Sequence, residues 1–131
     1  MIVVDASVLA NMLLYADDRG RRARAVLGRD TEWAAPEHWK AEVLSVVRGL
    51  ALGSKIKEEQ AVRAVDRLPL LGVDHVSLDE LLPRMWQLRH GISGSDAAYV
   101  ALAEARSIPL LTSDRRLART ATSYCRVELV A

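Results

Sequence analysis

Short apolar runs alternate with stretches of helical periodicity along this chain of 131 residues. The opening run, MIVV, is apolar and mostly β-branched, which is typical of a strand buried on both faces of a sheet. From Ser7, apolar side chains recur at helical spacing until the charged turn at 17–20, which predicts a first helix. A short basic helix at about 21–27 and a brief strand at 32–35 are predicted next.

A long helix is predicted over 36–52. Pro36 fits its first turn, where the missing N–H is not needed, and Gly53 is expected to end it. One stripe of this helix is apolar and consists of Trp39, Val43, Val46, Val47 and Leu50.

The alternation continues to the end of the chain. The remaining predicted elements are a helix at about 56–68, a strand at 73–77, a helix from a cap at Asp79 to His90, a helix from about Ser93, a strand at 108–112, a helix at 114–122 and a strand at 126–130. Such alternation of apolar strands and helices predicts an α/β fold of three layers, α/β/α, with a central parallel sheet. With half of its residues hydrophobic, the chain has material for one core, so we expect a single domain over residues 1–131.

Charge and cysteine content narrow the class of protein. The 18 Lys and Arg residues nearly cancel the 17 Asp and Glu residues, so any site for a polyanion must be local. Cys125 is the only cysteine, which excludes an intramolecular disulfide. The apolar N-terminal stretch lacks a basic start and contains Asp5, so it fits neither a signal peptide nor a membrane span. We therefore expect a cytoplasmic protein that has no membrane contact.

Four carboxylates are the candidates for chemistry. Asp5 ends the first strand, Glu42 lies within the helix at 36–52, Asp96 lies near the start of a helix, and Asp114 follows the fourth strand. In parallel sheets, ligands bind beyond the carboxyl ends of the strands, where the strand order reverses. If the first and fourth strands are neighbours, Asp5 and Asp114 reach the same crevice. Carboxylates suit Mg²⁺ or Mn²⁺, which can support phosphodiester hydrolysis by water.

Each of three acids also has a purely structural interpretation. Asp5 or Ser7 fits the cap of the first helix, Ser93 with Asp96 fits a capping box, and Asp114 fits the cap of its own helix.

Glu42 differs from the other three acids. Helical geometry places it about 40° from Val46 and about 60° from Trp39, at the edge of the apolar stripe. A carboxylate at the rim of a core needs a partner, and a metal ion, an arginine or solvent could each serve.

Taken together, four stretches of the sequence resemble the PIN-domain family, and in particular its VapC-type toxins, over essentially the whole chain. In chain order these stretches are MIVVDASVLANML, PEHWKAEVLSVVRGL, SGSDAAYVALAEA and PLLTSDRRLART. The resemblance implies a parallel sheet of five strands and a Mg²⁺- or Mn²⁺-dependent endonuclease that cleaves RNA. It also implies a cognate antitoxin whose tail covers the active site, and a homodimer that presents two such sites.

The resemblance assigns roles to the matched residues. It implies catalytic roles for Asp5, Glu42, Asp96 and Asp114, metal ligation by Asp5, Asp96 and Asp114, and hydrogen-bonding support from Ser7 and Thr112. Ser7 and Thr112 also fit a helix cap and a strand-end hydroxyl.

One departure from the family concerns the residues after Asp114. Some relatives carry a further acid there, whereas this chain has Arg115 and Arg116, so binding of one ion or of two stays open. These arginines fit either a contact to phosphate or a solvated helix face. The aromatic residues available for an interface, or for the core, are Trp33, Trp39, Trp86, Tyr15 and Tyr99. We assign no chemistry to His38, His75 or His90.

Two other functions compete with a ribonuclease. One is a phosphoryl-transfer enzyme or receiver-like switch that uses Asp5 as phosphate acceptor, although Ser7 stands where such phosphatases usually have a second aspartate. The other is a catalytically inactive module that binds RNA or protein, against which the presence of all four acids argues.

Overall fold

The computed structural model describes residues 1–130, and over these residues the chain forms five strands, seven α-helices and one 3-10 helix. In chain order they are β1 (Ile2–Val4), α1 (Ala6–Leu14), α2 (Asp18–Leu27), β2 (Trp33–Pro36), α3 (Trp39–Leu52), α4 (Glu58–Arg67), η1 (Leu68–Leu70), β3 (Val73–Val76), α5 (Leu78–Gln87), α6 (Gly94–Arg106), β4 (Leu110–Thr112), α7 (Arg115–Ala121) and β5 (Val127–Leu129). Every strand and helix predicted from the sequence is present, with shifts at the ends. No helix among these residues is long and apolar enough to cross a bilayer.

The strands form one parallel sheet in the order β3-β2-β1-β4-β5. β1 lies at the centre, and its three residues are buried, as expected for a strand covered on both faces. Because β2 and β4 flank β1, the strand order reverses there, and the first and fourth strands are neighbours. The parallel sheet of five strands and the shared crevice are therefore confirmed.

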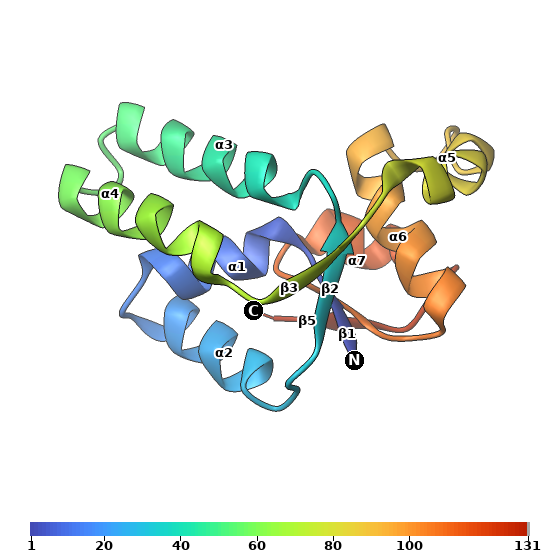
Figure 1. Ribbon diagram of the computed structural model, residues 1–131, viewed down its shortest axis with the longest axis horizontal. Coiled ribbons are helices and arrows are strands. Elements are labelled where there is room, and N and C mark those ends of the chain that lie inside the picture. The colour runs from blue at the N-terminus through green and yellow to red at the C-terminus, as the bar shows by residue number, and fades with distance from the viewer. Residues whose placement is uncertain (131) are drawn as a thin grey trace.

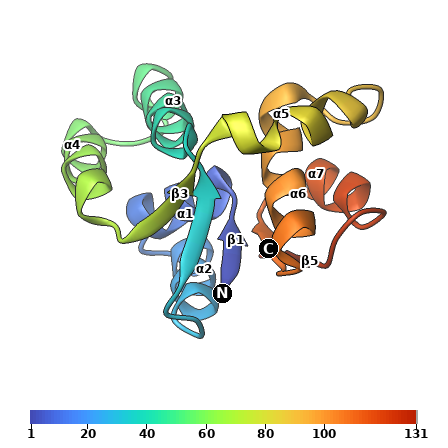
Figure 2. The same cartoon turned by 45° about the vertical axis from the view of Figure 1, so that its right-hand side comes forward.

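Helices cover both faces of this sheet (Figure 1). Helices α1 to α4 lie on one side of the strands, and α5, α6 and α7 lie on the other (Figure 2). Right-handed connections between parallel strands place helices on opposite faces when the direction of strand order changes, which explains this division. The predicted three-layer architecture is confirmed.

The start of α3 differs from the prediction. Pro36 is the last residue of β2, opposite Val76, and the helix begins at Trp39. The prediction for Pro36 was wrong because strand pairing outweighs the local preference for a helix start. A proline is tolerated at this position because the next residue, Glu37, supplies an N–H that donates to the Val76 carbonyl at 2.8 Å.

Two predicted helix boundaries also shift. Ser77, and not Asp79, caps α5, since the Ser77 hydroxyl accepts a hydrogen bond from the Asp79 N–H at 3.2 Å. This helix ends at Gln87 and not at His90. At the start of the helix, the Ser77 hydroxyl satisfies one of the free N–H groups of the first turn, which fixes that boundary.

The apolar stripe of α3 is only partly buried. Trp39, Val43 and Val47 belong to the core, Leu50 is half-buried, and Val46 is 39% exposed. Val46 is exposed, although it belongs to the apolar stripe, because it lines a pocket.

Candidate active site

Neighbouring strands bring Asp5 and Asp114 to one end of the sheet. Asp5 follows β1 and its N–H donates to the Leu111 carbonyl of β4 at 2.9 Å. The Asp5 carboxylate makes no capping hydrogen bond to α1. Its Oδ2 accepts instead from the hydroxyls of Ser7 and Thr112, each at 2.7 Å. Asp5 therefore occupies the N-cap position of α1, but its carboxylate does not cap the helix, and the hydrogen bonds expected from Ser7 and Thr112 are present.

These two hydroxyls also fix the loop after β4. The Ser7 Oγ accepts from the Ser113 N–H at 3.0 Å, and the Thr112 Oγ1 accepts from the Asp114 N–H at 3.0 Å. Each hydroxyl thus donates to Asp5 and accepts from the backbone, which uses both of its hydrogen-bonding capacities. The orientation of the Asp5 carboxylate is consequently set by the junction of α1 and β4.

Asp5 is a buried acid with other acids around it. It is 7% exposed, and burial raises the pKa of its carboxyl, against the lowering effect of the hydrogen bonds from Ser7 and Thr112. The charges of Asp96 and Glu42 raise that pKa further. An ionised Asp5 would therefore be stabilised by a cation in the pocket.

Glu42 reaches the same region from α3. The Tyr99 hydroxyl, on α6, donates to its Oε1 at 2.6 Å, and His38 Nε2 lies 3.2 Å from the same oxygen. Tyr99 is fully buried, and burial together with the Glu42 charge raises the pKa of its hydroxyl, which keeps the donor proton in place. The His38 and Tyr99 rings meet edge to face, with 5.6 Å between their centroids. The hydrogen-bond partner of Glu42 is therefore the Tyr99 hydroxyl, while the His38 imidazole lies beside the carboxylate without a hydrogen bond to it. The sequence predicted neither of these neighbours.

The sequence carried a weak signal for both partners. His38 lies four residues before Glu42, at the start of the same helix. Tyr99 lies three residues after Asp96, on the same face of α6. Nothing in the sequence alone pairs Tyr99 with Glu42.

Asp96 and Asp114 share an arginine. Arg116 Nη2 donates to Asp96 Oδ2 at 3.1 Å and lies 3.7 Å from Asp114 Oδ2. The Ser93 side chain makes no capping hydrogen bond, so the proposed capping box of α6 does not form. Asp114 does cap α7, because its Oδ1 accepts from the N–H groups of Arg116 at 2.9 Å and Leu117 at 3.2 Å.

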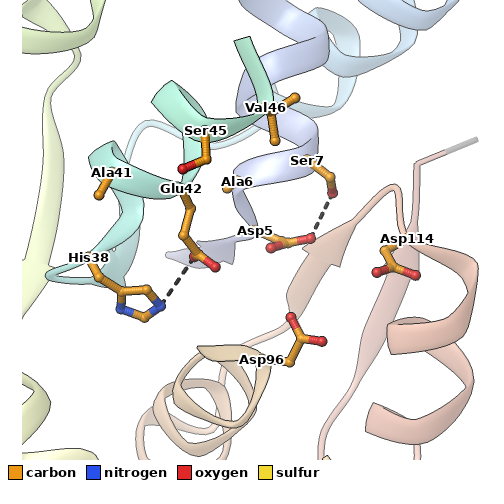
Figure 3. Close-up of a pocket in the computed structure, with 10 residues that line it drawn as sticks. All are labelled: Asp5, Ala6, Ser7, His38, Ala41, Glu42, Ser45, Val46, Asp96 and Asp114. Atoms are coloured by element: carbon orange, nitrogen blue, oxygen red, sulfur yellow. Dashed lines mark hydrogen bonds and ion pairs between the residues drawn. The ribbon is translucent and has the colours of Figure 1, made fainter. Parts of the chain in front are cut away.

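All four predicted acids line one pocket of about 470 Å³. Figure 3 shows the carboxylates of Asp5, Glu42, Asp96 and Asp114 facing this space, from β1, α3, α6 and the start of α7. The remaining lining residues are Ala6, Ser7, His38, Ala41, Ser45 and Val46. Thr112 does not line the pocket but lies fully buried beside Asp5.

The chemistry of these donors fits a hard divalent cation. All four donors are carboxylates. Burial raises the pKa of the Asp5 carboxyl, and a nearby positive charge would lower it again by stabilising the ionised form. Within residues 1–130, however, no three His, Cys, Asp or Glu side chains lie close enough together to hold an ion as they stand. Arg116 lies against Asp96 and Asp114, so an ion held by these two acids would compete with its guanidinium.

Comparison with known proteins identifies relatives over nearly the whole chain. The family described as "PIN domain" matches residues 2–123. The ribonuclease VapC1 of Mycobacterium tuberculosis is 38% identical over 133 residues, which cover 98% of this chain and 96% of that protein.

Solved structures share the fold. FitAcB from Neisseria gonorrhoeae superposes with a TM-score of 0.71 at 20% identity and covers 97% of this chain and 96% of its own. The Mycobacterium tuberculosis protein VapC20, described as a Sarcin-Ricin loop cleaving toxin, superposes with a TM-score of 0.61 at 23% identity and covers 84% and 87% of the two chains.

Proposed function

The chain belongs to the PIN domain family, and from that membership we propose that it is a metal-dependent endoribonuclease acting as the toxin of a toxin–antitoxin pair. The observation that carries the proposal is the convergence of four carboxylates on one pocket at the carboxyl ends of the central strands. Its relative at 38% identity is a ribonuclease, and VapC20, which shares the fold, is described as a toxin.

A divalent ion is part of this proposal. Asp5, Asp96 and Asp114 would hold Mg²⁺ or Mn²⁺, since their carboxylates face one another across the pocket (Figure 3). When bound, such an ion neutralises charge on the phosphate and lowers the pKa of a water molecule.

The protein's own side chains prepare the pocket for hydrolysis, in which water adds to phosphorus and a phosphorus–oxygen bond breaks. Ser7 and Thr112 orient Asp5 through its Oδ2. Tyr99 holds Glu42 through Oε1, and among the described residues no hydrogen bond occupies the other oxygen, Oε2. That free oxygen can accept a proton from the attacking water.

The competing functions find less support in the same geometry. A phosphate acceptor at Asp5 would have to use a carboxylate whose Oδ2 is already engaged by two hydroxyls in a buried position. An inactive binding module would not require four carboxylates around one pocket, where their mutual repulsion costs stability.

The deciding experiment is cleavage of total cellular RNA by the purified protein, with mapping of the cut ends. We expect discrete ends in Mg²⁺ or Mn²⁺, none in EDTA, and none with Asp5→Asn. Asp66→Asn is the matched control, because Asp66 is an exposed acid outside the acidic pocket. Undiminished cutting in EDTA or by Asp5→Asn would refute the proposed mechanism.

The antitoxin is the proposed partner. Its tail would cover the acidic pocket, and we expect its remaining part to bind an apolar groove between α3 and α4. This groove, about 340 Å³ in volume, is lined by the exposed side chains of Leu44, Leu52, Val62 and Val65. Exposed apolar patches of this kind mark interaction sites. Val62→Glu should therefore abolish neutralisation by the co-expressed antitoxin and leave RNA cleavage by the isolated protein unchanged.

We also propose a homodimer. Of the aromatic residues considered for an interface, Trp39 and Tyr99 are buried in the core, whereas Trp86 is 67% exposed. Sedimentation equilibrium should give twice the chain mass of 14.5 kDa, and Trp86→Ala should shift the protein towards the monomer.

A further inference from the structure

We propose that Arg116 is a resident counter-ion of the acidic pocket, which a divalent ion must displace and which therefore weakens metal binding. This inference rests on the proposed function, since it assumes that the pocket binds a metal.

The position of Arg116 between two acids is the first observation. A single nitrogen, Nη2, lies 3.1 Å from Asp96 Oδ2 and 3.7 Å from Asp114 Oδ2. The two acids come from different helices, α6 and the cap of α7. Their side chains are 17% and 37% exposed, so the shared cation offsets charge that water only partly screens.

The second observation is that Arg116 stands in an unfavourable place for a cation. It lies in the first turn of α7, where the helix dipole favours negative charge. Its own N–H is already bound to Asp114 Oδ1 at 2.9 Å, so backbone and side chain both contact the same acid. Attraction to the Asp96 and Asp114 carboxylates offsets the unfavourable interaction of the Arg116 guanidinium with the helix dipole. The guanidinium is therefore held beside these two acids.

Competition with a metal follows from these contacts. Asp96 Oδ2 and Asp114 Oδ2 both face Arg116, so a divalent ion that binds these oxygens competes with the guanidinium, and the two cations repel each other. The Arg116 side chain is 65% exposed, so it can swing out without disturbing the core. Once released, its guanidinium stays at the rim of the pocket with its donors free for a phosphate.

The test is Mn²⁺ affinity, measured by isothermal titration calorimetry and by electron paramagnetic resonance in the absence of RNA. Arg116→Ala and Arg116→Gln should each bind Mn²⁺ about two- to fivefold more tightly than the wild type, the range expected for partly exposed ion pairs. Arg115→Ala is the matched control, because it removes the same charge from the same helix turn. Among residues 1–130, Arg115 forms no ion pair with Asp96 or Asp114, so its removal should change the affinity by less than about twofold.

The outcomes separate this inference from the function on which it rests. If Arg116 served only to stabilise the fold, its replacement would lower the melting temperature in EDTA and leave the Mn²⁺ affinity unchanged, which would overturn the proposal. Equal tightening by Arg115→Ala would also overturn it, because the effect would then be one of net charge. A wild type that binds no Mn²⁺ would refute the metal site itself, and the inference with it.

Discussion

Removal of the Tyr99 hydroxyl is the most direct perturbation of the acidic pocket that leaves every acid in place. In Tyr99→Phe the ring remains packed in the core, and only the donor to Glu42 Oε1, at 2.6 Å, is lost. Little volume disappears, so the cavity contribution is small. The effect should therefore report on one hydrogen bond.

The size of the expected destabilisation follows from the burial of Tyr99 and Glu42, which form this hydrogen bond. A hydrogen bond to a charged group contributes about 1.5–3 kcal/mol. The Glu42 side chain is 26% exposed and keeps His38 beside it, so water and the imidazole offset part of the loss. We expect a destabilisation of about 1–2 kcal/mol. With an unfolding entropy of about 2.1 cal/mol/K per residue over 131 residues, the melting temperature should fall by about 4–7 °C.

The same substitution should reduce RNA cleavage. Without Tyr99, Glu42 loses the contact that fixes its carboxylate, and misplacement of a catalytic group costs about tenfold to a hundredfold in rate. Thermal unfolding and single-turnover cleavage measure the two effects. The control is Tyr124→Phe, because Tyr124 is 39% exposed and its hydroxyl forms no hydrogen bond within the described chain. If Tyr99→Phe melted and cleaved like the wild type, the hydrogen bond would not position Glu42 and our reasoning would be wrong.

Three further predictions concern the acids. Asp5→Asn should raise the melting temperature in EDTA at neutral pH, because burial raises the carboxyl pKa above its ordinary 3.8 and ionisation then destabilises the fold. This gain should vanish as the pH falls below about 3.8, where the acid is protonated in both states, and Mg²⁺ should narrow it by stabilising the wild type. In EDTA, Asp114→Ala should lose about 0.5–2 kcal/mol, since Asp114 caps α7, whereas Asp114→Asn should retain most of that stability. Equal melting of the two variants would contradict the cap. Expression of Asp96→Asn without an antitoxin should be tolerated where the wild type stops growth, and equal toxicity in growth curves would show that the site is misassigned.

Patterns within single elements determined much of the fold. The uniform apolar run at residues 2–4 predicted a strand covered on both faces. Apolar periodicity, together with cap and stop signals, predicted the seven α-helices but not the 3-10 helix η1. These signals are readable because side-chain direction repeats every two residues in strands and every 3.6 in helices. The four acids could be identified from the sequence through their resemblance to one family.

Contacts between distant elements could be identified only from the tertiary structure. Three hydrogen-bonded pairs around the pocket join residues that are far apart in the sequence. The separations are 57 residues for Tyr99 and Glu42, 20 for Arg116 and Asp96, and 107 for Thr112 and Asp5. Such pairs depend on strand order, on the side of the sheet that each helix covers and on rotamers chosen by packing, none of which repeats along the chain. Pro36 illustrates the same limit, since its local signal favoured a helix and pairing with β3 placed it in a strand. The sequence therefore determined which residues are the acids of the pocket. The tertiary structure decided which side chain pairs with each acid, because electrostatic and hydrogen-bond energies depend on distances through space.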